Sequence, residues 1–101
     1  MVLTLTQSEK EARIVVKGEI DERGAEELKR RFAEIKLTPG IGVALDFAGV
    51  THIGSAGIGK LLLFYKTVAS YGGTVRIERV EAHIYDLLQQ LKLGAILTIT
   101  K

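Results

Sequence analysis

The fold of this chain is decided by the stretch Val50–Tyr65, which reads VTHIGSAGIGKLLLFY. The apolar segment Val43–Phe47 leads into its small-residue turn, and from Ile58 onward apolar residues recur at helical spacing. Ser55 is therefore expected where a strand is followed by a helix. The first backbone N–H groups of a helix lack intrahelical partners and the macrodipole is positive there, so this position suits an oxygen acceptor or an added anion.

The rest of the chain predicts strands and helices in alternation. Strands are expected over residues 2–6, 12–17, 41–47, 74–78 and 96–100, because these runs are rich in β-branched and apolar residues. A helix is expected before Thr38–Gly40, a second from the Ser55 turn to Gly72-Gly73, and a third over residues 80–93. The predicted order is β-β-α-β-α-β-α-β.

This order indicates an α/β fold with a mainly parallel mixed β-sheet of about five strands and three or more helices. The first two strands are expected to be antiparallel neighbours, because only a short polar turn separates them. The strand at 41–47 has apolar residues facing both ways, so we expect it to be central and covered on both faces. In the second helix, the expected buried stripe is Leu61, Leu62, Tyr65, Val68 and Ala69, with Leu63 and Phe64 beside it.

Composition and length indicate one globular domain over residues 1–101. The chain is 47% apolar and 26% charged, carries a formal net charge of +2, and contains no cysteine, so disulfides, thiolate nucleophiles and cysteine-based zinc sites are excluded. The basic cluster Lys29–Arg31 lies beside glutamates, with Glu26/Arg30 and Glu27/Arg31 at i,i+4 helical spacing, which favours a solvated helix face over nucleic-acid binding. No signal-peptide pattern or run of about 18 apolar residues occurs, so we expect a cytoplasmic protein without membrane insertion.

Two segments that follow strands, Gly18–Asp21 and Gly49–Gly57, are expected to meet at the same end of the sheet, beyond the carboxyl ends of the strands, where sites in open α/β sheets usually lie. Asp21 and Asp46 are the acids expected near Ser55. Asp21 is equally well explained as the cap of the helix that follows it.

Catalytic patterns fit this region poorly. The turn departs from Gly-x-Ser-x-Gly because Ile53 stands two residues before Ser55, and only His52 and His83 could act as bases. A phosphate-binding loop is excluded because Lys60 is followed by a leucine. We therefore expect no catalytic residues, no metal site and no cofactor. Close packing of the helix on the sheet would explain the glycines at 57 and 59.

Several segments together resemble the STAS domain of the anti-sigma-factor antagonist family. They are Gly18–Asp21 (GEID), Leu45–Leu62 (LDFAGVTHIGSAGIGKLL), Gly72–Ile77 (GGTVRI) and Leu88–Leu97 (LQQLKLGAIL), which agree with the family in order and spacing. The resemblance covers nearly the whole chain and implies a STAS-like fold.

The resemblance also implies a bacterial partner-switching regulator of transcription that is not an enzyme. Such an antagonist binds an anti-sigma factor that is a serine kinase, is phosphorylated by it on the serine corresponding to Ser55, and is restored by a PP2C-type phosphatase. The implied partner-binding residues are Asp21, Asp46, Gly54, Ser55, Ala56 and Gly57. Most relatives have aspartate before the serine, where this chain has Gly54.

A second interpretation makes the chain the STAS scaffold subunit of a lipid-transport ABC complex, which binds the ATPase. Neither interpretation specifies the oligomeric state.

Overall fold

The computed structural model of the protein describes residues 1–101. Its elements follow the predicted order and are β1 (Val2–Gln7), β2 (Glu11–Ile20), α1 (Glu22–Glu34), β3 (Gly42–Ile53), α2 (Ser55–Ser70), β4 (Thr74–Glu78), α3 (Ala82–Gln90), the 3-10 turn η1 (Leu93–Ala95) and β5 (Thr98–Ile99).

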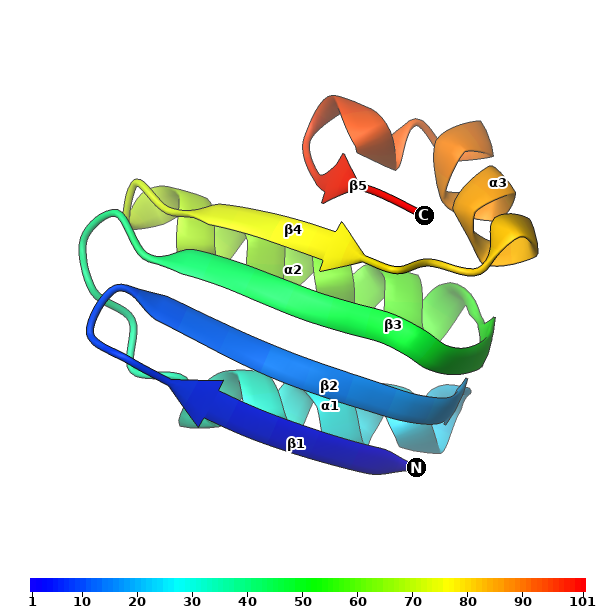
Figure 1. Ribbon diagram of the computed structural model, residues 1–101, viewed down its shortest axis with the longest axis horizontal. Coiled ribbons are helices and arrows are strands. Elements are labelled where there is room, and N and C mark those ends of the chain that lie inside the picture. The colour runs from blue at the N-terminus through cyan, green and yellow to red at the C-terminus, as the bar shows by residue number, and fades with distance from the viewer.

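The five strands form one mixed sheet in the order β1-β2-β3-β4-β5. Strands β1 and β2 are antiparallel, and every other neighbouring pair is parallel. Figure 1 shows the chain crossing the sheet steadily, with β1 at one edge and the short β5 beyond β4. The predicted α/β architecture, with an antiparallel first pair followed by parallel crossovers, is confirmed.

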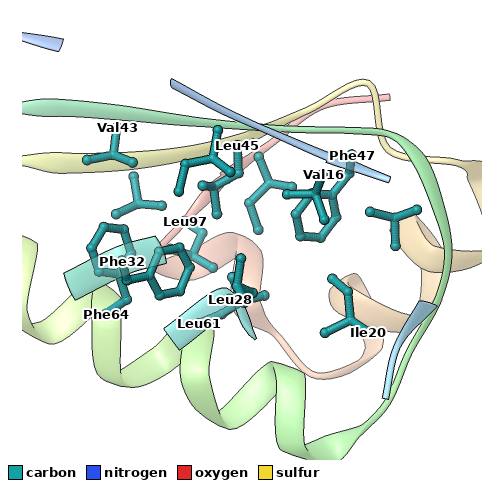
Figure 2. Packing of buried hydrophobic residues seen from close by; sticks show 14 of the residues in the cluster. Val16, Ile20, Leu28, Phe32, Val43, Leu45, Phe47, Leu61, Phe64 and Leu97 are labelled. Atoms are coloured by element: carbon teal, nitrogen blue, oxygen red, sulfur yellow. The ribbon is translucent and has the colours of Figure 1, made fainter. Parts of the chain in front are cut away.

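Helices α1 and α2 lie side by side behind the sheet (Figure 1). The rings of Phe32 and Phe64 join them, with centroids 3.9 Å apart and planes only 6° from parallel. Figure 2 shows these rings packed beneath the buried face of β3, next to Val43 and Leu45. Burial of this apolar surface is the main term that holds the helices on the sheet.

The other face of the sheet carries charged side chains in place of helices, so the expectation that β3 is covered on both faces was wrong. Arg13 pairs with Glu78 at 2.7 Å, and Arg76 reaches both Glu78 and Glu11 at 3.2 Å. These long side chains lie level with Ala44 and Asp46 in the register, which explains how both are buried without a covering helix.

The second helix is rotated from its predicted orientation and starts earlier, at Ser55. Its buried residues are Gly57, Leu61, Phe64 and Val68, whereas Leu63 is 61% exposed. The predicted stripe was centred wrongly because this helix is apolar almost all round, so spacing alone does not identify the inward face. The last helix and strand are also shorter than predicted. Helix α3 ends at Gln90, before the chain turns at Lys92, which has a positive φ of 61°, and the 3-10 turn η1 then precedes β5.

Strand β3 is longer than predicted and is irregular at its end. Its pairing with β2 slips twice, between Val15 and Lys17 and between Gly18 and Glu19, and at each slip β3 contains one more residue than β2. These are β-bulges, which bend a strand and increase its twist. They occur just before the turn that contains Ser55.

Candidate functional site at the start of α2

The ends of β2 and β3 bring two helix starts together. Ile20 pairs with Ile53 in the parallel register, and the Gly54 amide donates a hydrogen bond of 3.0 Å to the carbonyl of Ile20. Asp21 and Ser55 follow directly, at the beginnings of α1 and α2. The prediction that Gly18–Asp21 and Gly49–Gly57 meet at the same end of the sheet is confirmed.

Ser55 is the first residue of α2, and its side chain is exposed. The preceding cap residue is Gly54, which has no side chain to bond the free amides of the first turn. The first turn also contains no acidic residue. The start of α2 therefore has unsatisfied donors and a positive dipole end beside an accessible hydroxyl.

Asp21 caps α1, as one of its two predicted roles requires. Its backbone is extended, and its Oδ1 accepts a hydrogen bond of 2.8 Å from the amide of Gly24. Because Asp21 is also exposed, its carboxylate is accessible from solvent at this end of the sheet.

Gly57 and Gly59 differ, although close packing was expected to explain both. A Cβ on Gly57 would lie 2.5 Å from Cγ2 of Ile20 and 3.1 Å from Cγ1 of Ile53, whereas a Cβ on Gly59 would meet nothing within 4 Å. Close packing thus explains Gly57, and the prediction was wrong for Gly59.

A groove of about 370 Å³ runs between the first turns of α1 and α2. It is lined by Glu22, Glu26, Ala56, Gly59, Lys60 and Leu63. Within it, Lys60 Nζ lies 3.5 Å from a carboxylate oxygen of Glu26. Sequence reasoning missed Glu22, Glu26 and Leu63 because their proximity to Ser55 depends on how α1 packs beside α2. The groove thus combines the exposed side chain of Leu63 with charged walls. It lies beside Ser55, because Ala56, the next residue in the chain, is part of its lining.

Asp46 lies away from this cluster. It pairs with Val15 and Glu78 in the register, seven residues before the end of β3, which corresponds to roughly 20 Å at about 3.3 Å per residue. Its carboxylate accepts hydrogen bonds from Arg79 (2.5 and 3.2 Å) and from the amide of Ala48 (3.0 Å). The hydrogen bonds from Arg79 are the main reason that the pKa of Asp46 is lowered.

Neither histidine forms a catalytic pair with Ser55. His52 is exposed near the end of β3 and makes no hydrogen bond to Ser55, and His83 lies on α3, where Nδ1 is 3.0 Å from Glu81. The chain contains no cluster of three or more histidine, cysteine, aspartate or glutamate side chains arranged to hold a metal ion. None of its helices combines the length and apolar character needed to cross a bilayer.

Comparison with known proteins identifies the family to which this chain belongs. Residues 3–98 match the family described as "Mlab, STAS domain", so the chain belongs to the STAS family. The resemblance of the sequence motifs to the STAS domain is thereby confirmed at the level of the domain.

Solved structures of similar fold bear names of anti-sigma-factor antagonists. An antagonist from Mycobacterium paratuberculosis matches with a TM-score of 0.80 at 18% identity, over 98% of this chain and 84% of that one. One from Thermotoga maritima, described as a putative antagonist, matches at 0.76 and 20% identity, over 98% and 86%. The Bacillus cell fate determinant SpoIIAA in its phosphorylated form matches at 0.73 and 14% identity, over 99% and 92%. At these identities the likeness establishes the fold.

Proposed function

We propose that this protein is a non-enzymatic anti-sigma-factor antagonist that binds a kinase-type anti-sigma factor and is switched by reversible phosphorylation of Ser55. The observation that carries the proposal is the exposed Ser55 hydroxyl at the start of a helix whose cap residue, Gly54, provides no side-chain acceptor. Structural neighbours named as antagonists support the same function, and one of them, SpoIIAA, also matches in its phosphorylated form.

The free domain can accommodate a phosphate at Ser55. Transfer of the γ-phosphoryl group from ATP forms a bond to Ser55 Oγ, breaks the bond to ADP and releases the hydroxyl proton to a base of the kinase. The product carries about −1.5 to −2 charges and three acceptor oxygens. The unsatisfied amides and positive dipole of the first turn of α2 stabilise such a group, so phosphorylation leaves the fold intact.

The same phosphate would oppose a closely packed complex. The proposed partner surface comprises Asp21 and the segment Gly54–Gly57, together with the groove that contains exposed Leu63. A partner that packs against Leu63 would have to remove water from the neighbouring phosphate, and the desolvation of a charge is unfavourable. Glu22 in the groove adds a like charge that the partner would have to balance, whereas Glu26 is already paired with Lys60. Asp46 lies outside this cluster, and its role is to hold Arg79 and the β4–α3 loop against β3.

The test is phosphorylation by the cognate kinase with ATP, followed by intact-mass measurement. We expect the mass of one phosphoryl group on the unmodified chain and none on Ser55→Ala. Thr51→Ala is the matched control, because Thr51 is an exposed hydroxyl residue on the same segment. Modification of Ser55→Ala, or no modification of the native chain, would contradict the proposal. A PP2C-type phosphatase should remove the phosphate.

A second candidate function is the STAS scaffold subunit of a lipid-transport ABC complex, bound to its ATPase. The family description names Mlab and not an antagonist, and Gly54 replaces the aspartate that usually precedes the phosphorylated serine. Neighbouring genes distinguish the candidates: a kinase or phosphatase gene supports the first, and permease and ATPase genes support the second. Co-purification with Ser55→Ala as bait provides a direct test, because only the first candidate requires a kinase among the captured partners.

A further inference from the structure

Strand β1 leaves one edge of the sheet open. It pairs only with β2, in a continuous register without a bulge. Alternate residues of an antiparallel strand direct their N–H and C=O groups away from the paired neighbour, so half of the backbone groups of β1 have no partner strand. Proteins usually protect such an edge with lysine, proline, a bulge or short length. Residues Val2–Gln7 (VLTLTQ) have none of these, whereas the opposite edge, β5, is only two residues long.

A charged groove of about 330 Å³ lies beside this edge, between β1 and α1. It is lined by Met1, Leu3, Glu27, Arg30, Arg31 and Glu34. Arg31 pairs with Glu34 at 2.8 Å, but Glu27 and Arg30 form no ion pair within the chain. One surface thus presents an acid and a base that are both available to a second molecule.

We propose that β1 binds β1 of a second copy of this chain, antiparallel and across a two-fold axis at Thr4, which joins the two five-stranded sheets. This register places Leu3 opposite Leu5 of the second copy, on the face of the sheet that α1 and α2 cover. It places Thr4 opposite Thr4 of the second copy, on the face that no helix covers. Opposite residues of an antiparallel pair point to the same face, so both copies keep their helices on one side of the joined sheet. No charged residues oppose each other along the two strands.

The charges of α1 are self-complementary in this arrangement. Hydrogen bonds of 2.7 and 3.0 Å between Gln7 and Lys36 hold the end of β1 beside the end of α1, and Met1 lies against Gly24. Thr4 is therefore level with the middle of α1, which lies behind β1 and β2 (Figure 1). A two-fold axis at that level sets the two α1 helices antiparallel, with Glu27 of each copy facing Arg30 and Arg31 of the other.

The pairing of the two β1 strands and the charges of α1 have different roles in the proposed dimer. Strand pairing and burial of Leu3 and Val2, which is 59% exposed, supply the affinity. Exposed ion pairs add little energy, so the charges of α1 mainly fix the register. The occupant favoured by the structure is a second copy, because the same edge and the same groove satisfy each other.

The first experiment is sedimentation of the full chain from about 5 µM to about 500 µM, a range that covers weak association. We expect a rise from 11.0 kDa to twice that mass. Thr4→Lys places two ammonium groups opposite each other and should weaken the dimer at least about tenfold. Thr98→Lys is the matched control on the other edge strand and should leave association unchanged. Both residues are exposed, and circular dichroism verifies that each variant is folded.

The second experiment is cysteine cross-linking, because the native chain contains no cysteine. Mild oxidation should link Thr4→Cys into a dimer, and Thr98→Cys should stay monomeric under the same conditions. Glu27→Arg should weaken the dimer, and adding Arg30→Glu should restore it. A monomer at every concentration, equal effects of lysine at both edges, or equal cross-linking at both edges would overturn the proposal. The outcome is independent of whether Ser55 is phosphorylated.

Discussion

Gly57 packs directly against Ile20, so closely that a Cβ at position 57 would lie 2.5 Å from Cγ2 of the isoleucine. This contact joins the first turn of α2 to the end of β2. Because Ile20 also accepts the hydrogen bond from the Gly54 amide, the position of Ser55 is set by both a backbone bond and a packing contact.

Alanine at this glycine should therefore destabilise the protein, whereas alanine at the next glycine of the helix should not. Gly57→Ala is expected to lower the free energy of unfolding by about 1–3 kcal/mol, because the added methyl group overpacks the contact with Ile20. Gly59→Ala meets nothing within 4 Å and should raise it by about 0.5–1 kcal/mol through helix propensity. Urea denaturation of both variants measures the difference, and equal effects would refute this packing argument.

Replacement of Phe64 should separate α1 from α2. Phe64→Ala removes the ring that stacks on Phe32 and should lower the free energy of unfolding by about 3–5 kcal/mol. Its neighbour Leu63 is 61% exposed, so Leu63→Ala should change stability by less than about 0.5 kcal/mol. Thermal and urea denaturation of this adjacent pair would show whether the inward face of α2 is assigned correctly.

Acid should weaken the attachment of the β4–α3 loop to β3. Hydrogen bonds from Arg79 hold the pKa of Asp46 below its ordinary value of 3.8, so the ionised carboxylate stabilises the fold at higher pH and this contribution is lost as pH falls through the lowered pKa. Asp46→Asn should lower the free energy of unfolding by about 1–2 kcal/mol near pH 6, and the difference from the native chain should shrink near pH 3.

Glu78 provides the comparison for that experiment. Hydrogen bonds from Arg13 and then Arg76 also lower its pKa from the ordinary value of 4.5, so Glu78→Gln should flatten part of the same acid transition. Denaturation curves for the native chain and both variants at several pH values separate the two carboxylates. A pH dependence unchanged in both variants would contradict this assignment.

An acid at position 54 should cap the start of α2. Gly54 has φ −100°, which any residue adopts, and a Cβ there would make only ordinary contacts of 3.8 Å with His52 and Ile20. Gly54→Asp should thus be accommodated and should stabilise the helix by a few tenths of a kcal/mol, up to about 1 kcal/mol, through side-chain capping. Denaturation tests the capping, and a loss of stability would show that glycine is required there.

A negative charge at Ser55 should weaken partner binding without unfolding the domain. Ser55→Asp is expected to be at least as stable as Ser55→Ala, because an acid in the first turn interacts favourably with the helix dipole, by about 0.3–1 kcal/mol. Calorimetry with the cognate anti-sigma factor should show weaker binding for Ser55→Asp than for the native chain. Unchanged affinity would count against the proposed switch.

The order of elements and the location of the Ser55 site, at the end of β3, were predictable from local patterns. The polar turn after Thr6 predicted the antiparallel pair, and the small residues around Ser55 marked the passage from strand to helix. The segment 74–78 was predicted with the bounds that the structure gives it. Each of these features depends on residues close together in the chain.

The misplaced features depend on contacts between distant segments. Asp46 is expected near Ser55 because it precedes Ser55 in the sequence, but the extended strand β3 separates the two residues along the sheet. Burial of Ala44 depends on Arg13 and Arg76, whose positions follow from strand register. Phe64 faces inward and stacks on Phe32 of α1, a contact between helices that no periodicity within α2 can identify.

The two extra residues at the end of β3 have a consequence for changes in chain length. One inserted residue reverses which side chains of a strand point toward the helices, and a second restores the original alternation. Ile53 therefore faces the core just as Leu45 does, at an even spacing along the chain. Deleting one residue between Ala48 and Thr51 would turn Ile53 outward and move Ser55 to the wrong side of the sheet. Deleting one residue from each bulge would straighten β3 and leave both Leu45 and Ile53 facing the core. Whether the number of deleted residues is odd or even therefore matters more than the length of the segment.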